Sequence, residues 1–146
     1  MKKLLFLNLV LGSFFCAHTQ QLSANKVPSA VMEGFKKAHP NVSATWEWED
    51  ANFEANFREG NKSMSCVLDK QGTIIETETM IGLSELPPKA RTYMEKNYKG
   101  KKLKEIAKIE KAGGQINYEV VMTGKELLFD AAGNFKQVEK EKREKD

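Results

Sequence analysis

An internal repeat constrains the fold of this chain more than any other feature of its sequence. The segment VPSAVMEGFKKAHP begins at Val27, and LPPKARTYMEKNYK begins at Leu86, fifty-nine residues later. Both open on an apolar residue followed by proline, and both continue as a short amphipathic stretch. Further along each copy, NFEANF matches NYEVVM and LDKQGTI matches FDAAGNF. Such self-similarity indicates two copies of one structural unit.

Each copy begins with a predicted helix that has one apolar side. In the first copy a proline follows Val27, where a missing N–H costs least, and Val31, Phe35 and Ala38 share one face. In the second copy Ser84 is placed as a helix cap. The apolar stripe of that second helix is formed by Leu86, Ala90, Met94 and Tyr98.

Alternating apolar and polar residues follow each helix and predict four strands per copy. Asp69 and Asp130, each three residues before a glycine, are interpreted as turn formers rather than as ligands. The strands are expected over residues 44–49, 53–58, 63–68 and 74–79, and again over 103–111, 116–122, 126–130 and 135–138.

The predicted fold class is therefore α+β, a tandem repeat of one helix plus a four-stranded antiparallel meander. About eight strands are expected in one sheet, with both helices on one face and the other face left to water. One domain is expected over residues 25–140, made of repeats 25–83 and 84–140. We expect the copies to share a core, because a unit of about 60 residues buries little apolar surface alone. Whether the two sheets are continuous is left open.

The two ends of the chain differ from this repeat. Residues 1–19 have the pattern of a secretory signal peptide, since Lys2 and Lys3 precede an apolar run that ends in small residues. The run is shorter than the roughly 20 residues of a membrane span. Cleavage and a periplasmic or secreted location are expected, and a lipid anchor at Cys16 is disfavoured because bulky residues precede it. Residues 141–146 are predicted to form a charged flexible tail.

Composition excludes several classes of partner and cofactor. The chain has 23 basic and 20 acidic residues, and removal of the two early lysines would bring its charge from +3 to about +1. Such a balance gives no strong field for nucleic acid. After cleavage Cys66 is the one cysteine left, so we expect no internal disulfide and a buried, inert thiol. His39 is the one remaining histidine, and neither a metal nor a cofactor is expected.

The repeat and its motifs resemble the PepSY-like family of secreted bacterial proteins, whose fold is similar to that of beta-lactamase-inhibitor proteins. The resemblance implies a tandem helix-plus-sheet module outside the cytoplasm that binds or inhibits other proteins, including peptidases. It implies no reaction, and no target-contacting motif of the inhibitors matches a position here. The residues that carry it are Val27-Pro28, Phe35, Trp46-Glu47-Trp48, Phe53-Glu54, Asp69, Gly72, Leu86-Pro87, Tyr118-Glu119, Asp130 and Gly133.

Aromatic residues are densest in the first predicted hairpin. Trp46, Trp48, Phe53 and Phe57 fall on one side of it, and alternating aromatics on a half-buried strand are typical of a core beneath a helix. The same side chains, with Tyr118, could instead line a ligand pocket between helices and sheet.

Three carboxylates lie on the other side of that hairpin. Glu47, Glu49 and Glu54, with Arg58 nearby, form a candidate contact face for a partner, although an ordinary solvated face explains them equally well.

Three hypotheses for function follow. The leading one is a non-enzymatic, secreted binding module that engages or inhibits an envelope protein through its open sheet face. The alternative is a carrier or sensor of small ligands, with a pocket lined by Trp46, Trp48 and Tyr118. The third and weakest is a hydrolase that uses Glu47 and Glu54 as a carboxylate pair.

Overall fold

The computed structural model of this protein describes residues 21–139, and of Glu139 only the backbone. The predicted signal peptide, Cys16 and the predicted tail lie outside the described residues. No helix between residues 21 and 139 has the length and apolar character that crossing a membrane requires.

Each repeat contains the helix and the four strands predicted from its sequence. The first repeat consists of β1 (Gln21–Leu22), the 3-10 helix η1 (Ala24–Lys26), α1 (Ser29–Ala38), β2 (Ala44–Glu49), β3 (Asn52–Glu59), β4 (Lys62–Leu68) and β5 (Ile74–Met80). The second consists of the 3-10 helix η2 (Leu83–Glu85), α2 (Pro88–Tyr98), β6 (Leu103–Lys111), β7 (Ile116–Met122), β8 (Lys125–Asp130) and β9 (Phe135–Glu139).

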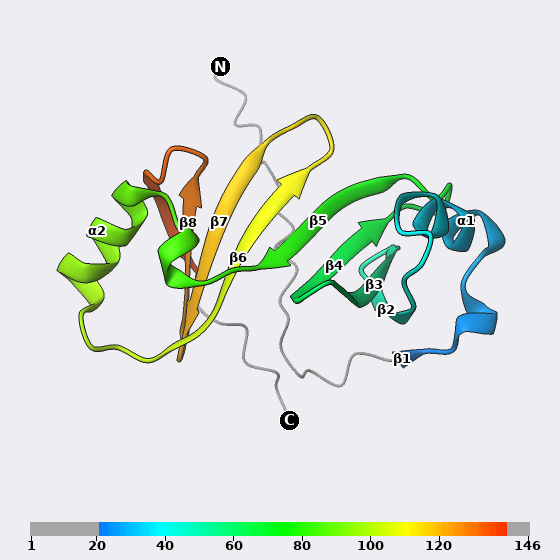
Figure 1. Cartoon of the computed structure of the whole chain (residues 1–146), viewed down its shortest axis with the longest axis horizontal. Coiled ribbons are helices and arrows are strands. Elements are labelled where there is room, and N and C mark those ends of the chain that lie inside the picture. Colours follow the sequence, from blue (N-terminus) through cyan, green and yellow to red (C-terminus); the bar gives the residue numbers. More distant parts are fainter. Residues whose placement is uncertain (1–20, 140–146) are drawn as a thin grey trace, which may run out of the picture.

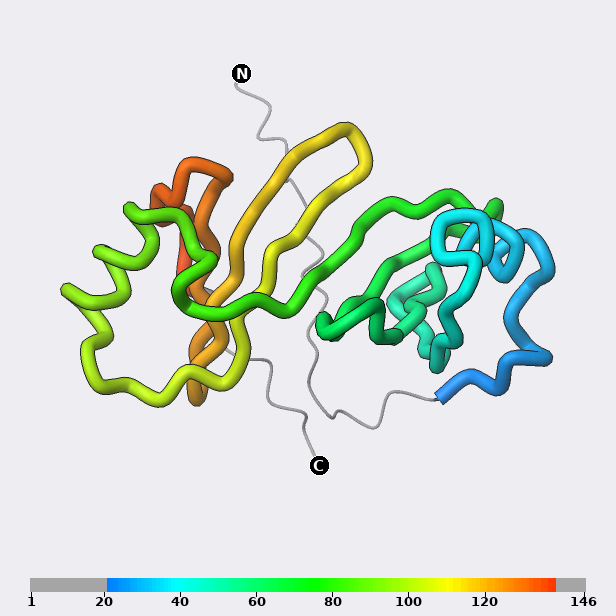
Figure 2. The backbone as a smooth tube through the Cα atoms, in the orientation of Figure 1, coloured from blue at the N-terminus to red at the C-terminus, as the bar shows by residue number. Residues whose placement is uncertain are grey.

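All the strands belong to one nine-stranded antiparallel sheet whose spatial order is the order of the chain. The two repeats are joined through β5 and β6, which pair from Glu76↔Lys111 to Met80↔Ala107. The sheet is therefore continuous from one repeat to the other. Figure 1 shows β5 running between the halves, with α1 and α2 at opposite ends of the molecule, and Figure 2 traces the same path along the backbone.

The register assigns every strand residue to one of two sheet faces, because side chains alternate along a strand. The face that carries the helices, called the helix face, includes Trp46, Ala55 and Cys66 in the first repeat. The opposite face, called the open face, includes Glu47, Glu54 and the residues that follow them across the sheet. Both helices lie on the helix face, as the strict alternation predicted.

The two repeats do not share a core, and this expectation was wrong. One cluster lies under α1 and contains Val31, Phe35 and Trp46; a separate one lies under α2 and contains Ala90 and Phe129. On the helix face between them stand polar residues of the two joining strands, which interrupt the apolar surface. These residues are Thr77, Thr79, Lys108 and Glu110. The repeats share the sheet, and each buries its own apolar residues.

A turn beneath each helix is built in the same way in both repeats. Asp69 Oδ1 accepts hydrogen bonds from the backbone N–H groups of Gln71 and Thr73, both at 2.9 Å. Asp130 Oδ1 accepts the equivalent bonds from Ala132 and Asn134, at 3.0 and 2.8 Å. Both aspartates are therefore turn formers, as predicted.

The glycine of each turn lies against its helix. A Cβ added to Gly72, which has a φ of 82°, would lie 2.1 Å from the carbonyl oxygen of Ala30. A Cβ added to Gly133, with a φ of 80°, would lie 2.7 Å from Pro87 Cβ. Glycine is required at both places by backbone conformation and by space.

Two local features differ from the sequence-based expectation. Ser84 does not cap α2, because it lies in η2 and the helix begins at Pro88 with Pro87 before it. The side chain that caps η2 is instead Glu85, whose Oε2 accepts a hydrogen bond from the N–H of Gly82 at 2.8 Å. The short strand β1 was not predicted, because its two residues are too few to show alternation.

Candidate functional site

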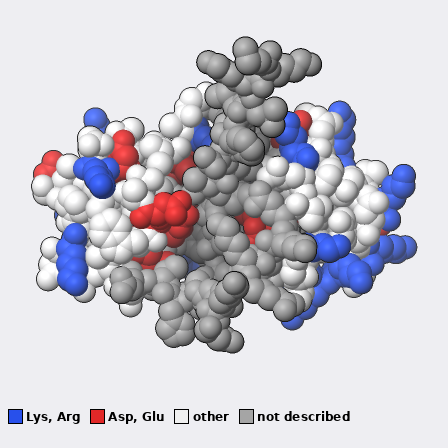
Figure 3. All heavy atoms as spheres, turned by 180° about the vertical axis from the view of Figure 1, so that it is seen from behind, with Lys and Arg blue, Asp and Glu red and all other residues white. Residues whose placement is uncertain are grey.

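The open face carries most of the acidic side chains of the sheet. Along one line of strand neighbours lie Glu47, Glu54, Val67, Glu76 and Lys111, from β2 to β6. Figure 3 views this side of the molecule, with acidic side chains towards the middle and most of the Lys and Arg side chains around the margin. Charge is thus separated within a chain whose net charge is small.

The carboxylates predicted as a contact face do lie together on the open face. Glu47 and Glu54 are direct cross-strand partners, and Glu49 is two residues from Glu47 on β2. Like charges directly opposite one another destabilise an antiparallel pair. Arg58 lies further along β3 and is held at the hairpin end, where Nη1 donates to Ser63 Oγ at 2.9 Å. It therefore does not neutralise the glutamate pair.

Three further carboxylates on this face were missed from the sequence. Glu76 and Glu78 lie on β5, and Glu119 lies on β7, at the position of the second repeat that matches Glu54. All three are less than a tenth exposed. The matching of NFEANF with NYEVVM, and the alternation in IIETETM, were the signals that could have found them. Together with Glu54 they form a set that we call the glutamate centre: Glu54, Glu76, Glu78 and Glu119.

Burial and mutual repulsion disfavour the charged forms of Glu54 and Glu78. The pKa of Glu54 is raised from 4.5 to about 7, mainly by burial and further by Glu49 and Glu47, while nearby Ser65 and Asn56 partly offset the rise. The pKa of Glu78 is raised to about 10, again mainly by burial and then by Glu119, Glu76, Glu54 and Glu49. At neutral pH Glu78 therefore holds a proton, and Glu54 holds one in part of the molecules.

Lys111 lies beside the glutamate centre. Lys111 Nζ is 3.0 Å from Glu76 Oε2, across the junction of the two repeats. Glu78 Oε1 has no hydrogen-bond partner among residues 21–139. Within that same range, no group of three or more His, Cys, Asp or Glu side chains is arranged to hold a metal ion.

The aromatic residues take several different positions. Trp46, Phe53 and Phe57 are buried in the cluster under α1, where the Trp46 ring meets Phe35 edge to face at 5.5 Å. Trp48 is 42% exposed and contacts Phe53 at the margin of this cluster. Tyr118 packs against the other cluster, under α2. The structure therefore does not bring Trp46 and Tyr118 to one pocket.

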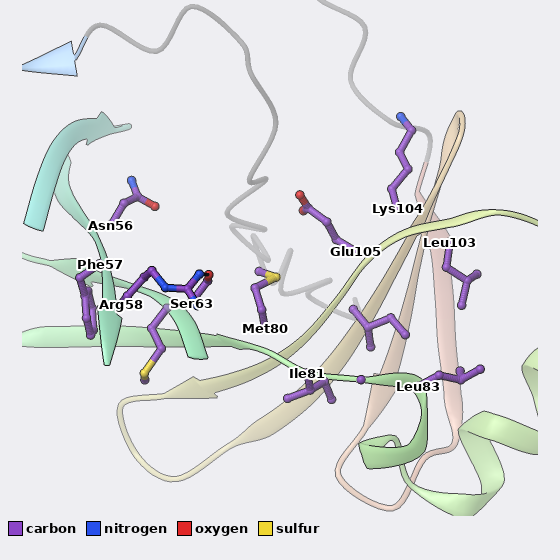
Figure 4. A pocket seen from close by; sticks show the side chains of 13 residues that line it. Asn56, Phe57, Arg58, Ser63, Met80, Ile81, Leu83, Leu103, Lys104 and Glu105 are labelled. Atoms are coloured by element: carbon purple, nitrogen blue, oxygen red, sulfur yellow. Dashed lines mark hydrogen bonds between the residues drawn. The ribbon is translucent and has the colours of Figure 1, made fainter. Parts of the chain in front are cut away.

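A cavity of about 870 Å³ lies where the two repeats meet. Strand β5 leaves the sheet after Met80, so the first residues of β4 and β6 diverge and leave a notch between them. Apolar side chains from both repeats line it, among them Met64, Met80, Ile81 and Ile106. Figure 4 shows Met80 between the β3–β4 hairpin end on one side and Glu105 on the other, with Asn56, Lys104 and Glu105 at the rim.

Burial decides the chemistry of the one cysteine in the described residues. Cys66 is fully buried beneath α1, and this burial raises the pKa of its thiol to about 12. The thiol is therefore inert, as predicted.

The chain matches one family. A model of the family described as "Putative beta-lactamase-inhibitor-like, PepSY-like" matches it twice, over residues 15–76 and 51–137. Two overlapping matches are expected of a tandem repeat. No curated protein matches the chain in sequence.

Several solved structures share the fold. A DUF2874 family protein from Bacteroides uniformis is 18% identical, covers 77% of this chain and 88% of its own, and has a TM-score of 0.67. A protein described as one of the "putative periplasmic proteins", from Bacteroides eggerthii, is 14% identical over 78% and 88%, with a TM-score of 0.69. A BLIP-like protein from Bacteroides fragilis is 20% identical over 82% and 89%, with a TM-score of 0.63. At these identities the likeness concerns the fold.

Proposed function

Since this chain belongs to the PepSY-like, beta-lactamase-inhibitor-like family, we propose that it is an exported, non-enzymatic protein that binds another protein of the cell envelope through its open face. A relative with the same fold is described as periplasmic, and another as BLIP-like. These descriptions support an extracytoplasmic binding role for the present chain.

The observation that carries the proposal is the arrangement of carboxylates on the open face. Glu47 and Glu54 are directly opposite each other, and Glu78 is buried among four other glutamates. Packing alone does not account for such an arrangement, because like charges and buried carboxylates cost stability. Local arrangements that weaken a fold are concentrated at functional sites.

The helix face has a different character. Both helices cover it, and each apolar cluster is already buried beneath its own helix. Within residues 21–139 the open face, by contrast, carries no helix and is a broad strand surface, and sheet surfaces of this kind can receive a loop or a hairpin of another protein. We therefore assign partner binding to the open face.

Cross-linking in the native compartment tests this proposal. A photo-reactive residue is placed on the open face in place of Thr45, and in a control on the helix side in place of Lys36; both positions are exposed. A partner should cross-link to the first position and not to the second. Absence of any cross-linked protein at the open face would count against the proposal.

Charge-altering variants give a second readout with a matched control. The variant with Glu47→Ala, Glu49→Ala and Arg58→Ala changes two acids and one base on the open face. The control with Glu33→Ala, Glu95→Ala and Lys96→Ala makes the same change on exposed helix positions. Retention of the cross-linked partner should fall about tenfold or more in the first variant alone, since charge pairs at an interface contribute on that scale. Equal retention by both variants would contradict the proposal.

A further inference from the structure

The glutamate centre brings acidic side chains together from several strands. Four strands supply its surroundings: Glu49 comes from β2, Glu54 from β3, Glu76 and Glu78 from β5, and Glu119 from β7. Lys111 of β6 is committed to Glu76 at 3.0 Å. Lys111 therefore pairs with one member of a set of carboxylates that repel Glu78.

Two polar side chains at the middle of this set have unused hydrogen-bonding capacity. Glu78 Oε1 makes no hydrogen bond within the described chain, although the residue is only 2% exposed. Asn56 lies in the same row of strand neighbours, on the other side of Ser65, and its buried Oδ1 makes no hydrogen bond there either. Buried polar atoms are nearly always paired, so two exceptions in one row indicate a place where a ligand group completes the pairing.

An apolar cavity lies directly beside these two side chains. Met80 follows Glu78 by two residues on β5 and so points to the same face, about 7 Å along the strand. Asn56, the cross-strand neighbour of Ser65, also lines the cavity, and its Oδ1 is unpaired. The cavity and the glutamate centre thus form one continuous surface, apolar at one end and acidic at the other (Figure 4).

Resting on the proposed function above, we propose that the partner binds through a basic, apolar segment: a lysine or arginine side chain enters the glutamate centre and pairs with Glu78, and a neighbouring apolar side chain fills the cavity beside Met80. Ammonium and guanidinium groups supply the donors that Glu78 Oε1 and Asn56 Oδ1 lack. Charge-assisted hydrogen bonds of this kind are about twice as strong as neutral ones.

Binding of such a cation is coupled to release of a proton. In the free protein, burial holds the pKa of Glu54 at about 7 and that of Glu78 at about 10, and the repulsion of Glu119, Glu76 and Glu49 raises the pKa of Glu78 further. An entering cation favours the charged carboxylate and lowers both pKa values. Affinity should therefore rise as the pH increases from about 6 to about 9.

Titration with two synthetic peptides tests the proposal on the full protein. The peptides share one apolar frame and differ at a central position, which is lysine in one and its uncharged isostere norleucine in the other. The lysine peptide should bind about tenfold more tightly at neutral pH. Calorimetry in buffers of different ionisation enthalpy should show proton release with the lysine peptide alone.

Two variants assign the effect to the glutamate centre. In Glu78→Gln the preference for lysine over norleucine should fall to about twofold or less, since the unpaired carboxylate is gone. Glu110→Gln is the matched control, because Glu110 is exposed on the helix face and already paired with Lys108 at 2.9 Å. It should retain the full preference, and thermal unfolding of both variants confirms that they are folded.

The outcomes separate this inference from the proposed function. Equal binding of the two peptides, or binding of neither, would overturn the inference, while cross-linking at the open face would still support a partner of other chemistry. Displacement of the lysine peptide by low concentrations of calcium chloride would assign the site to an inorganic cation, and that also overturns it.

Discussion

The two repeats share a backbone plan but place their helices on the sheet in different ways. In the first repeat, α1 approaches the turn beneath it so closely that a Cβ added to Gly34 would lie 2.0 Å from the carbonyl oxygen of Gly72. In the second, the position matching Gly34 is Tyr93, whose ring stacks on Phe135 at 4.7 Å and meets Phe129 edge to face at 5.6 Å.

This difference shows which features both repeats need and which can vary between them. The aspartate turn and its glycine are present in both repeats, whereas the spacing between helix and sheet is set by whichever side chain lies between them. A close backbone approach and an aromatic spacer are therefore alternative solutions to the same packing problem.

The largest expected effect concerns the independence of the repeats. Each has its own apolar cluster, yet separating them would expose the edges of β5 and β6 and leave about 60 residues per fragment, a marginal size. We expect residues 21–83 and 84–139, expressed alone, to show no cooperative thermal transition by circular dichroism. A cooperative transition in either fragment would show that the repeats are separate folding units.

The contrast between Gly34 and Tyr93 can be tested by a single methyl group. Gly34→Ala should destabilise the protein by about 3 kcal/mol, because the added Cβ meets backbone that cannot move aside, despite the better helix propensity of alanine. Gly60→Ala is the control: Gly60, unlike Gly34, has a positive φ, of 58°, but nothing lies within 4 Å of its added Cβ, so this change should cost only about 1 kcal/mol. Urea unfolding measures both. Similar values would show that α1 and its turn adjust freely.

The repeats also differ in charge, since the two strongly raised carboxyl pKa values belong to Glu54 on β3 and Glu78 on β5, both in the first repeat. Both pKa values lie above the ordinary value of 4.5. The stability that protonation of these two carboxyl groups gives the folded state is therefore fully present below about pH 4.5. It is lost as the pH rises through about 7 for Glu54 and about 10 for Glu78. Glu78→Gln should therefore stabilise the protein at pH 8 by about 2 kcal/mol and have little effect at pH 4.5.

Urea denaturation of the wild type and of Glu78→Gln across this pH range measures the difference. The control is Glu110→Gln, which should leave the pH dependence unchanged. A wild-type stability that rises between pH 5 and pH 8 would contradict the raised pKa values.

The smallest expected effect is the loss of stability when the aspartate of either turn is replaced. Asp69→Ala removes two hydrogen bonds from backbone N–H groups and should cost about 1 kcal/mol. Asp130→Ala should cost more, because the side chain of Asn134 also donates to Asp130, at 2.9 Å to Oδ2. Those hydrogen bonds lower the pKa of Asp130. The difference in cost between Asp130→Ala and Asp69→Ala should therefore become smaller in acid, where Asp130 is protonated. Thermal unfolding midpoints of the two variants at neutral and acidic pH show which substitution costs more stability.

Most of the fold was predictable from the sequence, because alternation and repetition are local signals. The predicted strands reappear in the structure within about a residue or two, and so do the helix starts after Val27 and Leu86. The separation of the two apolar clusters was not predictable from periodicity. Only the register of β5 against β6 shows that Thr77 and Lys108 lie between the clusters.

The candidate site was predictable only in part. Glu47, Glu49 and Glu54 follow one another on one hairpin, so a local pattern shows them together. Glu78 and Glu119 reach the same place through pairing of strands that are distant in sequence. The cavity depends on where β5 leaves the sheet, which no motif indicates.

The burial of Cys66 makes this protein well suited to spectroscopy. Its thiol is fully enclosed, and with a pKa of about 12 only about one molecule in ten thousand would carry a thiolate at pH 8. A cysteine introduced at an exposed position of the open face would accept a maleimide dye or spin label while Cys66 stays unmodified. In a chain that begins after the predicted signal peptide, and so lacks Cys16, the distance between the two repeats, and any change when a partner docks, can then be followed without replacing Cys66.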